Sequence, residues 1–311
     1  MGAAGASGRS LAEQLRARGL RVHCADVRPM HIPSATCHLI AEGPGFLPAL
    51  ARLVRTEGID LVVPASSDVL STVSSGRAVL GPDIDLVIPA AGPAATAQDR
   101  LLTAWSLWAH GIGVPDFGIP SDLADRTIVC SLMKSPLILR ARWVDDGRPP
   151  IVVDDPAGID WASLSDDVLV QEFVPGAAYK VVVYRPAEGK GRLTAVLEET
   201  VLDDGEVIGA CVIDTSTVPG VERLAQAAVR ALGLTGPVEV SLRHRVGGDP
   251  VVLDVRACFG PHSHLVPGLL DALLRDHPCG ERKFVGGRTP RPSTGGNGTR
   301  TGRAVLKGAG R

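Results

Sequence analysis

Two carboxylates and an arginine are expected on one face of a β-hairpin in the C-terminal half of the chain. Two strand-like segments, VEVSL and VVLDV, flank a Gly-Gly-Asp turn, which is typical of a hairpin. We expect this hairpin to place Glu239 and Asp254 as facing carboxylates, the oxygen ligands that Mg²⁺ prefers. Arg256, two residues after Asp254, would then put a positive charge beside the cation. For charges roughly 4 Å apart at an effective dielectric of about 20, that repulsion costs about 4 kcal/mol.

Arginines on a second expected strand could bind phosphate. Residues 136–142 read PLILRAR, with Arg140 and Arg142 at the end of an apolar run. A guanidinium group can bind phosphate oxygens through two parallel hydrogen bonds. The alternative explanation is a pair of surface arginines that flank a buried strand.

A third segment joins a strand to a turn. Residues 168–176 read VLVQEFVPG, an apolar run that ends at Pro-Gly. By itself this pattern is typical of any buried strand before a turn. The order of the three segments along the chain is more specific than any one of them.

In that order the segments resemble those of ATP-grasp enzymes, in particular carboxylate-amine ligases of the actinobacterial kind. The strand PVVLDVRACFG is similar to the family's metal-binding strand, in which Glu, Asn and Arg hold Mg²⁺ and the triphosphate of ATP. Asp254, Arg256 and Cys258 occupy those three slots here. The resemblance therefore implies a chain derived from such an enzyme, with its chemical positions altered.

The resemblance also implies roles for the other two segments. Arg140 takes the slot of a lysine that contacts the ATP phosphates, and Arg142 takes the slot of the arginine after it. The VLVQEFVPG segment is similar to the hinge between the two ATP-grasp subdomains. Adenine would there bond the backbone of Glu172 and Val174, with Gln171 near its exocyclic amine.

Three further positions depart from the family or stay open. Ala178 replaces the glutamate that binds ribose, and WVDDGRPPIVVDDPAG, from Trp143, replaces a phosphate flap rich in glycine and serine. Four aspartates in that segment would repel a triphosphate unless Mg²⁺ intervened. His262 and His264 are either contacts to substrate or phosphate, or ordinary loop histidines.

Enzymes of this family phosphorylate a carboxylate with ATP and let an amine attack the acyl phosphate. The resemblance implies ATP and Mg²⁺ as cofactors and small carboxylates and amines as substrates. It implies catalytic roles for Arg140 and Arg256, and metal ligation by Glu239 and Asp254. The altered positions predict weakened metal binding and weak catalysis. Three roles stay open for Arg256: it replaces one metal ion, it binds a phosphate in place of Cys258, or it belongs to a site that no longer binds metal. A ligase that forms a C–N bond is the favoured interpretation, and a non-catalytic binding or regulatory homologue is the alternative.

The N-terminus suggests a different chemistry. Gly2, Gly5 and Gly8 precede a helix-like segment, and an expected strand ends at Asp26. Such glycines admit a phosphate at a helix N-terminus, and an acidic residue about 20 positions later can bind a ribose hydroxyl. This fingerprint would suit an NAD(P)-dependent reductase, but the strand that should precede it is missing. Neither tyrosine of the chain has a lysine four residues on, so this function is the least favoured.

The elements that position these residues predict a mixed α/β and α+β chain in three parts. Residues 1–95 alternate strand and helix patterns, which predicts a Rossmann-like parallel α/β domain that lacks its first strand, through a late or wrongly assigned start. Residues 96–276 are expected to form a two-subdomain ATP-grasp fold, hinged near 168–178 and entered through a helix over 96–110. Residues 277–311, with eight Arg or Lys and one Glu, are expected to form a disordered basic tail rich in Gly, Arg and Pro.

Composition excludes several classes of protein. The 311 residues are 45% hydrophobic and 21% charged, as in globular proteins, and contain no run of roughly 18 apolar residues that could form a membrane helix. Six scattered cysteines favour reduced thiols. The N-terminus lacks a basic stretch followed by an apolar one, so a cytoplasmic location is the expectation. The His23-Cys24 and Cys37-His38 pairs are better explained as core residues than as zinc ligands. The tail shows no aromatic stacking pattern and no recognition helix, which disfavours nucleic acid as a partner. A homodimer stays an open expectation.

Overall fold

The computed structural model describes residues 2–123, 133, 136–144, 150–188, 191–201 and 207–278. One compact unit spans Met1–Cys279. The expected basic tail lies outside the described residues except for His277 and Pro278, and so do residues 145–149 of the segment that replaces the flap.

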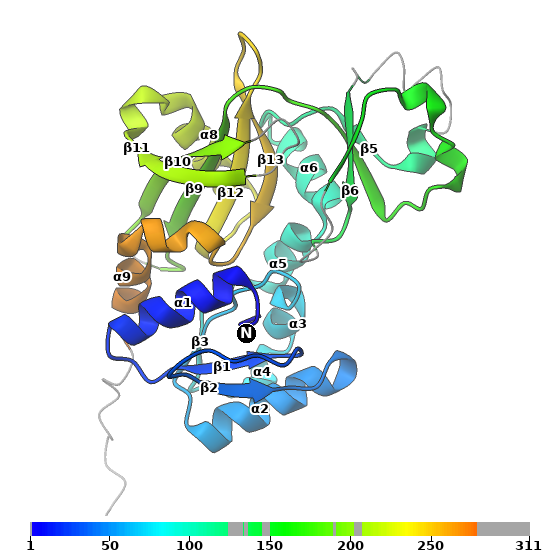
Figure 1. The fold of residues 1–311 in the computed structure, drawn as a ribbon. Helices are drawn as coiled ribbons and strands as arrows, with labels where there is room; N and C mark the ends of the chain where they lie inside the picture. Colours follow the sequence, from blue (N-terminus) through cyan, green and yellow to red (C-terminus); the bar gives the residue numbers. More distant parts are fainter. Residues whose placement is uncertain are drawn as a thin grey trace, which may run out of the picture. The chain divides into compact units, whose positions relative to one another are not determined.

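The N-terminal part alternates helices with short parallel strands (Figure 1). Strand β1 pairs with β2, and β3 pairs with β4, both in parallel. The elements are α1 (Ala6–Ala17), β1 (His23–Asp26), β2 (Thr36–Leu39), α2 (Phe46–Glu57), β3 (Leu61–Val62), α3 (Leu70–Ser75), α4 (Arg77–Leu80), β4 (Asp85–Leu86), α5 (Ala91–Gln98) and α6 (Arg100–Ala109). Among the described residues no strand precedes α1.

The rest of the unit contains two antiparallel sheets. One has the strand order β5-β8-β6-β7, and the larger one has the order β11-β10-β9-β12-β13. The smaller sheet consists of β5 (Phe117–Gly118), β6 (Leu137–Ala141), β7 (Ile151–Val153) and β8 (Val168–Glu172). The larger sheet and its helices are β9 (Ala178–Arg185), β10 (Leu193–Val201), β11 (Val207–Ile213), α8 (Pro219–Ala231), β12 (Gly236–His244), β13 (Pro250–Arg256), the 3₁₀ turn η6 (Pro261–Leu265) and α9 (Pro267–Asp276). The mixed α/β and α+β class expected from the sequence is confirmed.

Alternation along the strands gives the two faces of the larger sheet different contents. Val181 and Val183 of β9, with Val240 of β12, are buried in the same core cluster as α8. Val182 and Tyr184 point to the opposite face, where they join the α9 cluster. Because successive side chains of a strand point to opposite faces, that second face also receives the polar residues of β12 and β13.

The helix expected over 96–110 is two helices. Asp99 adopts an extended backbone conformation between α5 and α6, and its side chain accepts hydrogen bonds from the backbone N–H of Leu101 (2.9 Å) and Leu102 (3.3 Å). Asp99 is thus the N-cap of α6, which satisfies amides that have no partner within the helix. The apolar spacing runs on across the break, which is why the pattern alone predicts one helix.

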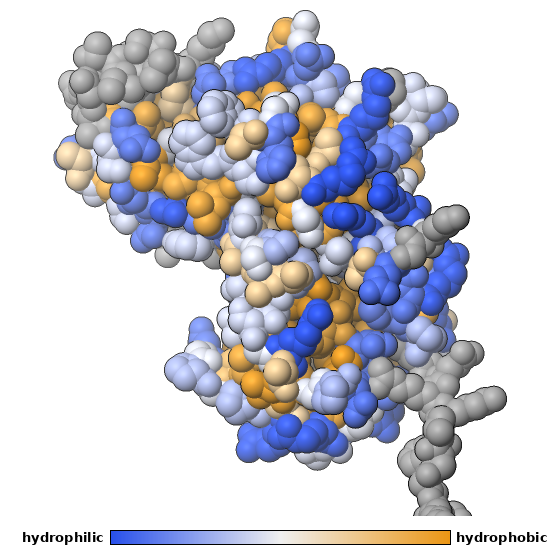
Figure 2. Space-filling view, turned by 180° about the vertical axis from the view of Figure 1, so that it is seen from behind, coloured by the Kyte–Doolittle hydropathy of each residue, from blue (hydrophilic) through white to orange (hydrophobic). Residues whose placement is uncertain are grey.

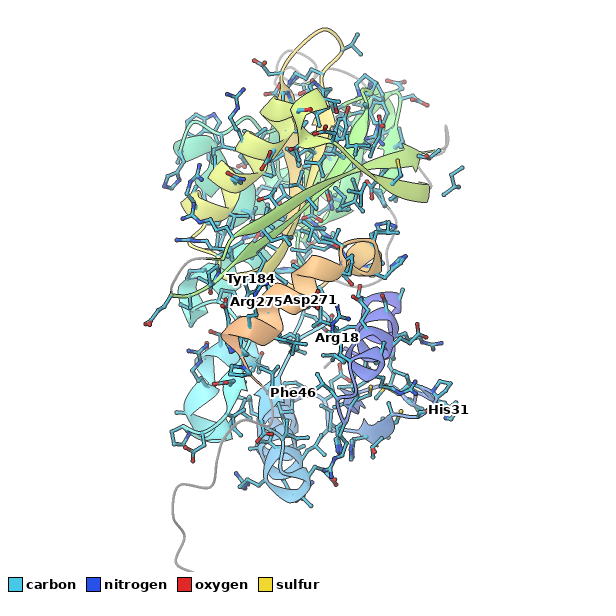
Figure 3. All side chains as sticks on the ribbon, turned by 90° about the vertical axis from the view of Figure 1, so that its left-hand side faces the viewer. Arg18, His31, Phe46, Tyr184, Asp271 and Arg275 are labelled. Atoms are coloured by element: carbon cyan, nitrogen blue, oxygen red, sulfur yellow. The ribbon has the colours of Figure 1, made fainter. Side chains whose placement is uncertain are left out.

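Helix α1 contacts α9 through a pair of charged residues. The Arg18 guanidinium donates to Asp271 of α9 at 2.7 Å, and Figure 3 shows Arg18 reaching toward that helix. Gln14 of α1 donates to the Ser263 hydroxyl at 3.1 Å. These contacts attach the glycine-led helix to the segment that directly follows the β12–β13 hairpin.

The surface carries several large apolar side chains among hydrophilic ones, as the face in Figure 2 shows. Leu102, Trp105 and Trp108 of α6 are each about half exposed. No helix within the described ranges is long and apolar enough to cross a membrane.

Candidate functional site

The polar face of the β12–β13 hairpin is set by its register. Glu239 lies directly opposite Arg256, and Ser241 lies opposite Asp254. The expected facing pair of carboxylates is therefore wrong: Glu239 and Asp254 share a face but are diagonal neighbours, a wider spacing than that of a directly opposed pair. On the other side of β12, Lys180 of β9 is the register partner of Ser241.

Three arginines surround the carboxylate of Asp254, which is buried. Its Oδ1 accepts from Arg100 Nε at 3.3 Å, and its Oδ2 accepts from Arg140 Nη2 at 3.1 Å. Arg256 Nε lies 3.5 Å from the same Oδ2. Burial alone would raise the pKa of the Asp254 carboxyl, but Arg140, Arg100 and Arg256 together hold it well below its usual value.

The three arginines come from three different elements. Arg100 begins α6 and also donates to the backbone carbonyls of Ala141 (2.6 Å) and Trp143 (3.0 Å), so it is fixed between the helix and β6. Arg140 lies on β6, a strand of the smaller sheet, and Arg256 is the last residue of β13, in the larger sheet. The cluster around Asp254 therefore joins the two sheets.

Arg140 lies beside the expected hinge. Its Nη1 is 3.4 Å from the Gln171 side-chain oxygen and 3.4 Å from the Leu253 carbonyl. Burial lowers the pKa of the Arg140 guanidinium and Asp254 opposes that shift, while Arg100 and Arg256 lower the pKa further. The structure thus brings together Arg140, Gln171, Asp254 and Arg256 from the predicted site.

Glu239 is as deeply buried as Asp254 but has different neighbours. Its side chain is 3% exposed, and its Oε1 has no hydrogen-bond partner among the described residues. Burial raises the pKa of the Glu239 carboxyl, although Lys180, Arg256 and the backbone N–H of Gly260 act in the opposite direction. A Cβ at Gly260 would lie 1.8 Å from the carboxyl atoms, so only glycine fits there without displacing Glu239.

A second charged group lies along the same face. Lys180 Nζ donates to the Ser241 hydroxyl at 2.8 Å and lies 3.7 Å from Glu199 Oε1. His262 Nδ1 is 4.0 Å from that same Glu199 oxygen, and burial lowers the pKa of the His262 ring. His264 is exposed, and its Nδ1 lies 3.0 Å from the Pro261 carbonyl of its own turn.

These donors do not fit a magnesium ion. Both oxygens of Asp254 are occupied by guanidinium groups, and a cation placed there would meet three positive charges. Within the part of the chain that the structure describes, no group of three or more His, Cys, Asp or Glu side chains could hold a metal ion. We therefore derive no chemistry from a metal at Glu239 and Asp254.

The side chains of Arg142 and Glu172, two predicted nucleotide-binding residues, pair with other residues of the protein. Arg142 forms a two-pronged ion pair with Asp99, with Nη2 at 2.7 Å and Nε at 3.0 Å, and this hydrogen bonding raises the pKa of Arg142. Arg142 thus attaches β6 to the N-cap of α6, away from Asp254. The Glu172 carboxylate accepts from Arg245 at 2.6 Å and from the Asp116 backbone N–H at 3.3 Å.

The hinge backbone is partly occupied. The Glu172 N–H donates to the Asp116 carbonyl at 2.8 Å, and the Val174 carbonyl accepts from Arg243 Nη1 at 3.1 Å. Val174 itself is buried. Adenine recognition by this backbone is untested by the structure and stays a prediction.

Sequence reasoning missed Arg100 and Lys180 as members of the site. Arg100 follows Asp99 inside the segment expected to form one helix, and no local pattern there indicates a contact with Asp254. Lys180 lies two positions after Ala178, so β-strand alternation puts it on the same face, which is the one signal that could have identified it. Cys258, in the slot of an arginine, is buried with its Sγ 3.3 Å from the Ser67 hydroxyl.

The glycine turn at the N-terminus uses Asp26 internally. The Asp26 carboxylate accepts from the backbone N–H groups of Ala4 and Arg28, each at 2.9 Å. Burial would raise the pKa of Asp26, but these hydrogen bonds lower it overall. A carboxylate that already binds the turn is a poor partner for a ribose hydroxyl, so the geometry gives no support to a reductase.

Comparison with known proteins identifies the fold. No protein-family model and no curated protein matches the chain. Its structure is similar to that of an L-amino acid ligase from Bacillus licheniformis, with 16% identity, a TM-score of 0.63, and coverage of 82% of this chain and 65% of the ligase. It is also similar to the ADP complex of PurK, an N5-carboxyaminoimidazole ribonucleotide synthetase, with 17% identity, a TM-score of 0.64, and coverage of 82% of this chain and 68% of PurK. A third match is carboxyaminoimidazole ribonucleotide synthase from Aspergillus clavatus complexed with ATP, with 18% identity, a TM-score of 0.64, and coverage of 83% of this chain and 69% of the synthase.

These neighbours have the ATP-grasp fold, so the chain has that fold as well, which confirms the expected fold. The chain covers slightly less than two thirds of the length of the L-amino acid ligase.

Proposed function

We propose that the chain binds an adenine nucleotide between its two antiparallel sheets, as a relative of ATP-dependent carboxylate-amine ligases in which catalysis is weakened. The observation that carries the proposal is the contact between Arg140 of the smaller sheet and Asp254 of the larger one. It places a cationic cluster directly beside the hinge residue Gln171. A nucleotide with its base at the hinge would thus have guanidinium groups within reach of its phosphates.

Each predicted contact then has a stated task. The backbone of Glu172 and Val174 would hold adenine, with Gln171 near the exocyclic amine. Arg140 and Arg256 would bind phosphate oxygens, since a guanidinium offers several donors in one plane. Small carboxylates and amines are the proposed substrates if transfer still occurs.

The same cluster limits catalysis. Transfer of a phosphoryl group depends on positively charged groups that stabilise the charge that develops in the transition state, usually with a metal. Here the carboxylates expected to hold that metal are engaged by arginines or diagonal to each other. A non-catalytic nucleotide-binding or regulatory protein is the second candidate, and the saturation of Asp254 by arginines is the observation that favours it.

Calorimetric titration with ATP and GTP tests nucleotide binding. We expect one saturable site that prefers ATP. Gln171→Leu should lower ATP affinity by about tenfold because it removes a polar contact near the base. Gln226→Leu is the matched control, because Gln226 bonds Thr194 and Glu222 on the far side of the sheet. Absence of saturable binding by any adenine nucleotide would refute the proposal.

Phosphate release across a panel of acids and amines separates the two candidates. A ligase with weak catalysis should release phosphate faster when both a carboxylate and an amine are present. If release stays at the background rate across the panel while ATP still binds, the non-catalytic candidate is the correct one.

A further inference from the structure

The cationic cluster around Asp254 points to a ligand of defined charge. Arg100, Arg140, Arg256 and Lys180 lie on or against one face of the larger sheet. The carboxylates that pair with these four cations are Asp254 and Glu199, and Glu239 is the register partner of Arg256. The four cations outnumber these three carboxylates whether or not Glu239 is ionised, and a cluster with surplus positive charge attracts anions.

The members of the cluster differ in how accessible they are. The side chain of Arg256 is 38% exposed, while those of Arg140 and Lys180 are each 18% exposed. Arg100 is 8% exposed and is held by two backbone carbonyls as well as by Asp254. Arg100 thus holds Asp254 from the buried side of the cluster. Arg256 and Arg140 are the more exposed guanidiniums, which a ligand can reach.

Asp254 holds Arg140 in place without using all the donors of its guanidinium. A guanidinium has five N–H donors in a fixed plane, and the contacts of Arg140 to Gln171 and Leu253 are long, at 3.4 Å. Phosphate oxygens match that planar arrangement and are charged, so they can form shorter and stronger hydrogen bonds.

We propose that the arginine cluster takes the place of a divalent cation, so that the site binds the metal-free polyphosphate of a nucleotide and Mg²⁺ weakens binding. The inference rests on the proposed nucleotide function and specifies the form of its ligand. Mg²⁺ removes two negative charges from a triphosphate, which reduces its attraction to the cluster. The ion itself is repelled by guanidiniums at close range in a site of reduced dielectric.

The test titrates wild-type protein with ATP, adenosine and inorganic tripolyphosphate, each in EDTA and in excess Mg²⁺. We expect ATP and tripolyphosphate to bind about tenfold more tightly in EDTA than in Mg²⁺, and adenosine to be indifferent to Mg²⁺. Tighter binding of ATP in Mg²⁺ than in EDTA would overturn the inference.

Arg256→Asn sharpens the test. We expect about a tenfold loss of ATP affinity in EDTA and a loss of the Mg²⁺ effect, because one reachable guanidinium is gone. Arg18→Asn is the matched control, because the Arg18 guanidinium pairs with Asp271 of α9 at a partly exposed contact and not with Asp254. Equal losses in both variants would contradict the assignment to Arg256, and circular dichroism checks that each variant is folded.

The outcomes separate the inference from the proposed function. If tripolyphosphate binds in EDTA as tightly as ATP and adenosine does not bind, the base contributes nothing to affinity. The cluster is then an anion site, and the proposal that the hinge binds adenine fails. If ATP binds no more tightly than adenosine, the nucleotide function stands and the inference fails. If none of the three ligands binds, both fail.

Discussion

Asp254 and Glu239 are two buried carboxyl groups on one sheet face, and their surroundings shift their pKa values in opposite directions. Three guanidiniums keep the pKa of Asp254 below its usual value. Burial raises the pKa of Glu239, whose Oε1 has no hydrogen-bond partner in the described part of the chain. Similar burial of similar groups is thus accompanied by pKa shifts in opposite directions, because the neighbouring charges differ.

The difference shows how one arginine can act on two neighbouring carboxyl groups. Arg256 is the register partner of Glu239 and an ion-pair partner of Asp254. One side chain therefore changes the charge around both groups. What remains is a cationic site at Asp254 and a carboxyl without a full set of partners at Glu239.

The largest effect is expected from Asp254→Asn. The change leaves Arg100 and Arg140 without their counter-charge, and removal of one partner from a buried ion pair typically costs about 3–5 kcal/mol. We expect a loss of that order in the free energy of unfolding at pH 7, measured by urea denaturation.

Asp271→Asn is the control for that prediction. The side chains of Asp271 and Arg18 are 53% and 26% exposed, and such surface pairs contribute roughly 1 kcal/mol or less. If the two variants lose similar amounts of stability, the cluster around Asp254 is not what holds the two sheets together.

The sequence predicts the hairpin, the hinge strand and β6 well, because these depend on local patterns. Period-two alternation identifies β12 and β13, and the Gly-Gly-Asp turn fixes where they meet. The exact pairing is harder, because a bulge between Ser241 and Leu242 shifts the register. That pairing decides that Glu239 faces Arg256 instead of Asp254.

The site is less predictable, because its partners are distant in the sequence. Arg142 was assigned to phosphate by its slot, but its ion-pair partner Asp99 lies 43 residues away. Arg100 reaches Asp254 across 154 residues, which no local pattern encodes. Only the packing of α6 against β6 and β13 brings these charges together.

A smaller effect tests the glycine that accommodates Glu239. In Gly260→Ala the new Cβ would overlap the Glu239 carboxyl, and overpacking of this kind costs about 1–3 kcal/mol. We expect that loss in urea denaturation, and we expect it to shrink when Glu239→Ala is combined with it, because the clash partner is gone.

Gly158→Ala is the matched control for Gly260→Ala, since an added Cβ there meets nothing within 4 Å. It should leave stability nearly unchanged. Additive losses in the double variant of Gly260 and Glu239 would show that the two residues do not compete for the same space.

The smallest effect is a pH dependence from Glu239→Gln. A carboxyl whose folded pKa is raised contributes stability that is fully present below its unfolded pKa, about 4.3, and is lost as the pH rises through the folded pKa. Gln is neutral at every pH, so the variant avoids that loss. We expect both proteins to unfold with similar free energies at pH 4.5, and the variant to be more stable by about 1 kcal/mol at pH 8. A variant that is less stable than wild type at pH 8 would mean that Lys180 and Arg256 hold Glu239 ionised, and the contrast with Asp254 would disappear.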